Sequence, residues 1–139
     1  MTSRLVLAVV FSAIGLSVLA AQPFRAINRL YVVPIDPNTF EVIEDRGAGA
    51  RDMWCAAADY VQAIGRDRAR LRLYVQDVRG PSRTVPNRIG VVYTLDPDDT
   101  LKQTPSSYSV TVTTAGENLE VGHARNFCDY FIEDIFDRF

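Results

Sequence analysis

Two cysteines constrain the fold of this chain most, because each lies in a segment with helical periodicity. Cys55 and Cys128 are the only cysteines, so a bond between them leaves no odd thiol. If both helices cover the same face of a sheet, the two sulfur atoms can meet. Two buried free cysteines are an alternative, and a redox pair is another, although redox pairs usually occur as Cys-x-x-Cys. We expect a structural disulfide that joins the two helical segments.

Residues 1–21 have the pattern of a cleavable signal peptide. Arg4 is their single charged side chain, Leu5–Ile14 is apolar apart from one serine, and small residues end the segment. A short positive start, an apolar stretch of about 7–15 residues and a small-residue site define such a signal. The alternative is an uncleaved anchor helix, which needs about 20 apolar residues. We expect cleavage after Ala20 or Ala21 and a periplasmic or secreted protein, with membrane contact only through this segment if it stays uncleaved.

Residues 22–139 are expected to form a single domain of ordinary size. They contain no internal repeat, no low-complexity tract and no second domain boundary. The whole chain has 15 Lys and Arg against 17 Asp and Glu, and loss of Arg4 leaves 14 against 17, a net charge of −3. Nucleic-acid binding relies on a basic face, so this mildly acidic domain is a poor candidate for it.

Hydrophobic periodicity predicts an α+β fold. Alternating apolar and polar residues are typical of strands with one packed face, and apolar residues at three- and four-residue steps are typical of helices. Strands are expected at 29–33, 39–44, 71–76, 89–95 and 108–113, and helices at 50–64 and 123–136. The first two strands flank Pro34–Asn38, whose residues favour a hairpin turn. The order ββαβββα predicts an antiparallel sheet of about five strands with two helices on one face and one inter-helix disulfide.

Residues 79–88, here called the arginine loop, form the most distinctive connection in the sequence. Arg79, Ser82, Arg83 and Arg88 lie within it, and two prolines stiffen it. Guanidinium groups suit carboxylates and phosphates, and loops on rigid scaffolds often carry function. These four residues are therefore a candidate site for an anion or a partner. The alternative is a solvated connection between strands whose arginines pair with surface acids.

His123 is the only histidine, and it lies near the expected start of the last helix, with Glu120 three residues earlier. A lone histidine without a recognisable nucleophile partner is a weak indication of catalysis. No serine lies in a nucleophile-elbow pattern, and one histidine without spaced partners does not make a zinc site. We therefore expect no catalytic residue, no metal and no cofactor, and interpret His123 as an exposed residue near a helix terminus.

Acidic residues gather at two places without forming a recognisable site. The segment Asp96–Asp99 matches no calcium-loop spacing and is expected to be a turn that also begins the next segment. Glu41, Glu44 and Asp45 are close in sequence, but a glycosidase needs two carboxylates flanking a cleft, and nothing places these opposite one another. We expect them on the solvated face of a strand.

Three runs of the chain resemble a known group of proteins. The runs are Met53–Tyr60, Arg79–Pro86 and Asn126–Cys128. They are similar to those of an uncharacterised family of small exported proteins of marine-type alphaproteobacteria, and the resemblance covers most of the chain after the signal. It implies a periplasmic or secreted location in a Gram-negative cell, and it carries over no activity, ligand or catalytic residue.

Taken together, these patterns favour a non-enzymatic exported domain that binds a partner. The arginine loop would be the contact surface, and the partner would be a protein, the envelope or a small anion. One alternative is a small periplasmic hydrolase that uses His123 and nearby acids. Another is a structural envelope component that self-associates through an exposed strand edge.

Overall fold

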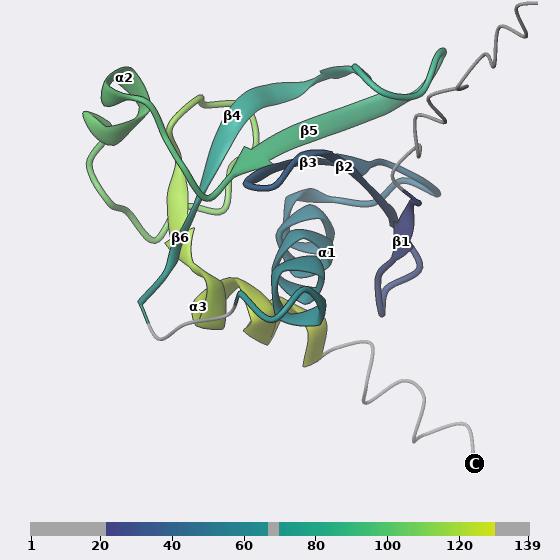
Figure 1. Cartoon of the computed structure of the whole chain (residues 1–139), viewed down its shortest axis with the longest axis horizontal. Helices are drawn as coiled ribbons and strands as arrows, with labels where there is room; N and C mark the ends of the chain where they lie inside the picture. Colours follow the sequence, from purple (N-terminus) through teal and green to yellow (C-terminus); the bar gives the residue numbers. More distant parts are fainter. Residues whose placement is uncertain (1–21, 67–69, 130–139) are drawn as a thin grey trace, which may run out of the picture.

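The computed structural model describes residues 22–66 and 70–129, and these form an antiparallel sheet with a helix against one face (Figure 1). The described elements are β1 (Phe24–Arg25), β2 (Tyr31–Asp36), β3 (Thr39–Ile43), α1 (Ala50–Ala63), β4 (Arg72–Pro81), β5 (Ile89–Thr94), α2 (Asp99–Lys102), β6 (Asn118–Glu120), α3 (Val121–Arg125) and the 3-10 helix η1 (Asn126–Cys128). The strand order in the six-stranded sheet is β1-β2-β3-β5-β4-β6. The predicted signal segment lies outside the described residues.

The hairpin of β2 and β3 forms where the sequence predicted it. Its turn is closed by Asp36, whose Oδ1 accepts a hydrogen bond from the Asn38 backbone N–H at 2.8 Å. Such a side-chain bond to a backbone group two residues on is the reason why Asp favours turns. β1 extends the sheet by pairing with the first residues of β2.

Helix α1 packs against the sheet through a row of small residues. Ala56–Ala58 are fully buried, and the absence of bulky side chains there lets the helix approach the strands closely. Larger rings fill the remaining space: the Trp54 and Tyr93 ring centroids lie 5.0 Å apart, and those of Phe40 and Tyr60 lie 4.6 Å apart. The core therefore lies between α1 and the faces of β2, β3, β4 and β5 that it covers.

The disulfide between Cys55 and Cys128 is confirmed. It joins α1 to η1, with the two Cα atoms 5.0 Å apart and both residues fully buried. The helical segment that carries Cys128 starts at Val121, two residues before the predicted start, and continues as η1. The predicted part of this helix beyond residue 129 lies outside the described residues.

The prediction of a strand at 108–113 is wrong. This segment forms no strand, and the sixth strand of the sheet is β6, further along the chain. The physical reason is a set of local hydrogen bonds: the hydroxyls of Ser107, Ser109 and Thr111 each accept from the backbone N–H two residues on, at 3.1, 3.3 and 3.2 Å. Ser and Thr side chains that bond to nearby backbone compete with the ladder of a sheet.

Tyr93 has a hydroxyl group without a hydrogen-bond partner among the described residues, although its side chain is fully buried in the core. Burial raises the pKa of Tyr93 well above its usual value of 10. An unsatisfied buried polar group costs about 1–3 kcal/mol. The aromatic ring of Tyr93 therefore stabilises the core by packing, whereas its buried hydroxyl lowers the stability of the fold.

We expect Tyr93→Phe to raise the free energy of unfolding by about 1 kcal/mol, because it removes the unsatisfied hydroxyl and keeps the ring. Urea denaturation followed by circular dichroism measures the change. Tyr60→Phe is the matched control, because Tyr60 also packs on Phe40 but its hydroxyl is not an unpartnered buried atom. A clear loss of stability in Tyr93→Phe would contradict the expectation.

Candidate functional site

The arginine loop is folded back onto the sheet face opposite α1. Ser82 and Arg88 close it through a 2.8 Å hydrogen bond from the Ser82 N–H to the Arg88 carbonyl. Beneath it lies Glu41 of β3, between two residues of the hydrophobic core, Phe40 and Val42. Because successive side chains of a strand point to opposite faces, the Glu41 carboxylate points away from the core and toward the loop.

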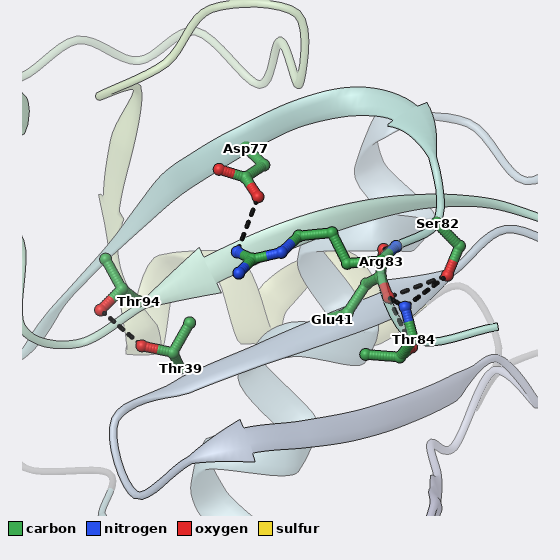
Figure 2. A network of polar contacts seen from close by, with 7 residues as sticks. All are labelled: Thr39, Glu41, Asp77, Ser82, Arg83, Thr84 and Thr94. Carbon is green, nitrogen blue, oxygen red and sulfur yellow. Dashed lines mark hydrogen bonds and ion pairs between the residues drawn. The ribbon is translucent and has the colours of Figure 1, made fainter.

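Glu41 anchors the loop with both carboxylate oxygens (Figure 2). Its Oε2 accepts from the Ser82 hydroxyl at 2.9 Å, the Thr84 N–H at 3.0 Å and the Thr84 hydroxyl at 2.5 Å. Its Oε1 accepts from the Arg83 N–H at 2.9 Å. The residue is only 1% exposed. The prediction that Glu41 lies on a solvated strand face is therefore wrong, because the loop covers that part of the face.

Gly90 of β5 makes room for this carboxylate. A Cβ at this position would lie 2.5 Å from Glu41 Oε1 and 2.8 Å from its Cδ. No ordinary side chain therefore fits at position 90 while Glu41 stays in place. The sequence does contain a sign of this contact, because a glycine inside a strand often marks the close approach of another group.

The three arginines of the loop each have an acidic partner. Arg79 forms two hydrogen bonds with the Glu44 carboxylate at 2.6 and 2.5 Å, and this pairing raises its pKa. Arg83 Nη1 lies 2.8 Å from Asp77 Oδ2. Arg88 Nη2 donates to the Glu44 carbonyl at 2.8 Å and lies 3.6 Å from Asp45 Oδ1.

These ion pairs remain accessible at the surface. The side chains of Arg79, Arg83 and Arg88 are 47%, 50% and 43% exposed. Exposed ion pairs contribute little to stability, about 0–1 kcal/mol each. The loop therefore presents positive and negative groups in fixed positions rather than a cluster of unpaired positive charge.

A second site lies at the other end of β4, around His123. It is a pocket of about 230 Å³, lined by residues from β4, β6, α3 and the segment before Ser109: Arg72, Ser106, Ser107, Tyr108, Leu119, Glu120 and His123. Trp54 holds the nearby segment in place, because its indole N–H donates to the Val110 carbonyl at 2.9 Å. His123 and Glu120 are close in the sequence, but most of their neighbours in this pocket come from distant segments that no sequence pattern connects to them.

The pocket does not hold a nucleophile–base pair. Within residues 22–66 and 70–129, His123 makes no hydrogen bond with a serine hydroxyl or a carboxylate. The Ser107 hydroxyl donates instead to the buried carboxylate of Glu117. A serine hydrolase needs its nucleophile within hydrogen-bond reach of the base, so the hydrolase alternative gains no support from this arrangement.

Asp98 has a structural role that agrees with the sequence interpretation of a turn that begins the next segment. Its Oδ1 accepts from the Leu101 N–H at 2.8 Å and so caps helix α2. Side-chain oxygens at this position satisfy an N–H that has no partner within the helix. In the described part of the chain, no group of three or more His, Cys, Asp or Glu side chains is placed to hold a metal ion.

The described sheet ends in short strands on both sides. β1 has two residues and β6 has three. The part of β2 that β1 does not pair with contains Pro34, which has no backbone N–H to donate to another strand. Short edges and proline are features that discourage pairing with another chain. On the β6 side, however, β4 extends seven residues beyond its pairing with β6, and there Val75 and Arg79 donate backbone hydrogen bonds to Glu117 and Val112. Self-association through a strand edge stays an alternative.

Comparisons with protein-family models, with curated proteins and with solved structures gave no match. Among the described residues, no helix is both long enough and apolar enough to cross a membrane.

Proposed function

We propose that this chain is an exported, non-enzymatic interaction domain that binds a partner protein through the arginine loop. The observation that carries the proposal is the burial of Glu41 beneath the loop, with four hydrogen bonds to Ser82, Arg83 and Thr84. A loop held in one conformation loses little entropy when it binds, and this lowers the cost of association. Resemblance to small exported alphaproteobacterial proteins is part of the same proposal.

The surface around the loop has the composition of a protein contact. Val78 and Ile89, on the two strands that lead into and out of the loop, are 41% and 40% exposed. Apolar groups within a rim of charged groups are typical of protein interfaces. A protein surface fits this arrangement better than a small anion does, because the arginines already face acidic partners. Export is supported by the disulfide, which is compatible with an oxidising compartment.

We expect a variant with Arg79, Arg83 and Arg88 all changed to Ala to lose partner binding by about tenfold or more, as for interface residues with large effects. The tagged protein is used to capture partners from an envelope extract of the producing cells. A captured protein is then purified and its affinity is measured directly. The fold should be kept, because exposed ion pairs contribute little to stability.

The matched control changes Arg25, Arg51 and Lys102 to Ala, which removes the same charge from exposed positions outside the loop. The control should bind as the unchanged protein does. Equal affinity of both triple variants for the partner would defeat the proposal. Raising the salt concentration should slow the association of the partner with the unchanged protein more than its association with the loop variant. The reason is that charged residues at the rim of an interface mainly affect the association rate.

A further inference from the structure

The pocket around His123 is separate from the arginine loop. Arg72 begins β4, and the arginine loop begins seven residues later at Arg79, so the two sites lie roughly 23 Å apart along the strand. Figure 1 shows β6 and α3 at the opposite side of the molecule from the β4–β5 turn. At about 230 Å³, the pocket is smaller than the roughly 300–1,000 Å³ typical of sites for drug-sized ligands. It suits one ring-sized molecule.

The charges around the pocket disfavour an anion. Arg72 lies 3.9 Å from Glu120, measured from Nη1 to Oε1, and Glu117 adds a second carboxylate behind the Ser107 hydroxyl. The fork of Arg72 is also occupied: its Nε donates to Asn118 Oδ1 at 2.6 Å and its Nη2 donates to the Asn118 carbonyl at 3.1 Å. The Nε–Nη2 edge of the guanidinium, one of the two edges that could bind a phosphate or carboxylate with two parallel bonds, is therefore already used within the protein. Nη1 lies beside Glu120, whose negative charge disfavours an anion at the other edge.

The same groups suit hydroxyls. A hydroxyl both donates and accepts, so neighbouring hydroxyls on a ring match a donor that lies next to an acceptor. Arg72 offers such a donor at Nη1, and Glu120 offers an acceptor beside it. Ser106 adds a hydroxyl to the same lining. The pocket thus offers paired donors and acceptors without an excess of positive charge.

An aromatic row borders these polar groups. The Tyr108 ring is 89% exposed, and its centroid lies 6.1 Å from that of His123. The His123 ring in turn lies 5.7 Å from Phe127. Such a large exposed ring beside a polar pocket offers a flat apolar surface to a ligand with an apolar face, and aromatic rings beside a few fixed polar groups are typical of small-molecule sites. A sugar ring has both an apolar C–H face and a rim of hydroxyls.

We propose that this pocket binds a neutral saccharide unit, with Tyr108 packed on the sugar ring and with Arg72 and Glu120 bonded to its hydroxyls. This binding is independent of the arginine loop.

The test is a titration of the ¹⁵N-labelled protein, followed by the backbone amide resonances. The probes are glucose, galactose, mannose and their disaccharides, and the comparison ligands are inorganic phosphate and tetramethylammonium. We expect at least one sugar to shift the amides of Tyr108, Glu120 and His123 in a saturable way, and the two ions not to do so. Tyr108→Ala should weaken sugar binding by about tenfold, and it should fold because its side chain is exposed.

Two variants serve as controls. Tyr31→Ala removes another exposed tyrosine, on β2, and should bind sugar as the unchanged protein does. The loop variant with Arg79, Arg83 and Arg88 changed to Ala should also keep sugar binding, which separates this site from the proposed partner surface. The proposal is overturned if no sugar gives saturable shifts, if Tyr108→Ala binds sugar as tightly as Tyr31→Ala does, or if phosphate or tetramethylammonium saturates the same amides instead.

Discussion

Removing the Cys55–Cys128 bond should lower the free energy of unfolding by about 4 kcal/mol. The bond closes a loop with a sequence separation of 73 residues, for which the chain-entropy model gives a value of this size. Typical domains have a total stability of about 5–15 kcal/mol, so the loss is large. The effect should be strongest at α3, because this short helix and η1 pack against α1 at the bridge. Urea denaturation of the double variant Cys55→Ala, Cys128→Ala measures it.

Reduction provides the control for this result. A thiol reductant should shift the urea midpoint of the unchanged protein toward that of the double variant and should leave the double variant unaffected. Amide hydrogen exchange should then speed up at Leu119 and His123 before it does so in the core of the sheet, because local opening requires less free energy than global unfolding. Identical midpoints of the unchanged protein with and without reductant would show that the bridge does not stabilise the fold.

Glu41→Ala should lower the free energy of unfolding by about 3 kcal/mol and release the arginine loop. Hydrogen bonds to charged groups contribute about 1.5–3 kcal/mol each, and removing the carboxylate leaves the donors of Ser82, Arg83 and Thr84 without their acceptor. Part of this cost is recovered as the loop reaches water. Hydrogen exchange at residues 82–85 measures the release, and urea denaturation measures the loss of stability.

Two further variants define the role of Glu41. Glu120→Ala is the control, because this glutamate side chain is 49% exposed and exposed substitutions usually change stability by less than about 0.5 kcal/mol. Glu41→Gln keeps the size of the side chain but turns one acceptor into an NH₂ group that faces N–H and O–H donors, so its effect should lie between the other two. Equal urea midpoints for Glu41→Ala and Glu120→Ala would contradict the anchoring role. If the partner proposal is correct, Glu41→Ala should also weaken partner binding.

Several features of the fold follow from local sequence patterns. Helical periodicity located α1, and turn residues located the β2–β3 hairpin. Two cysteines, each in a segment with helical periodicity, favoured the bond that the structure confirms. The helix and the hairpin depend on residues that are neighbours in the chain, and the disulfide depends on a cysteine that has only one other cysteine to pair with. The α+β class could be predicted because helices and sheets with one apolar face bury those faces against one another.

Other features required the assembled fold. The run of β-type residues that identified β3 as a strand does not reveal what covers its second face, so Glu41 was expected in solvent although the loop buries it. The alternating pattern at 108–113 also led to a wrong prediction of a strand. Hydroxyls at every second position there accept hydrogen bonds from the nearby backbone instead of lying on the solvent face of a paired strand.

By itself, the sequence determined helix α1, the β2–β3 hairpin, the α+β class and the pairing of the two cysteines, because these follow from short-range periodicity, from turn residues and from the presence of only two cysteines. Only the tertiary structure brought Arg72, Tyr108, Glu120 and His123 to one pocket and placed acids beside each arginine of the loop. The physical reason is that both sites combine residues far apart in the chain. Their positions depend on how the sheet pairs and on which loop covers which face.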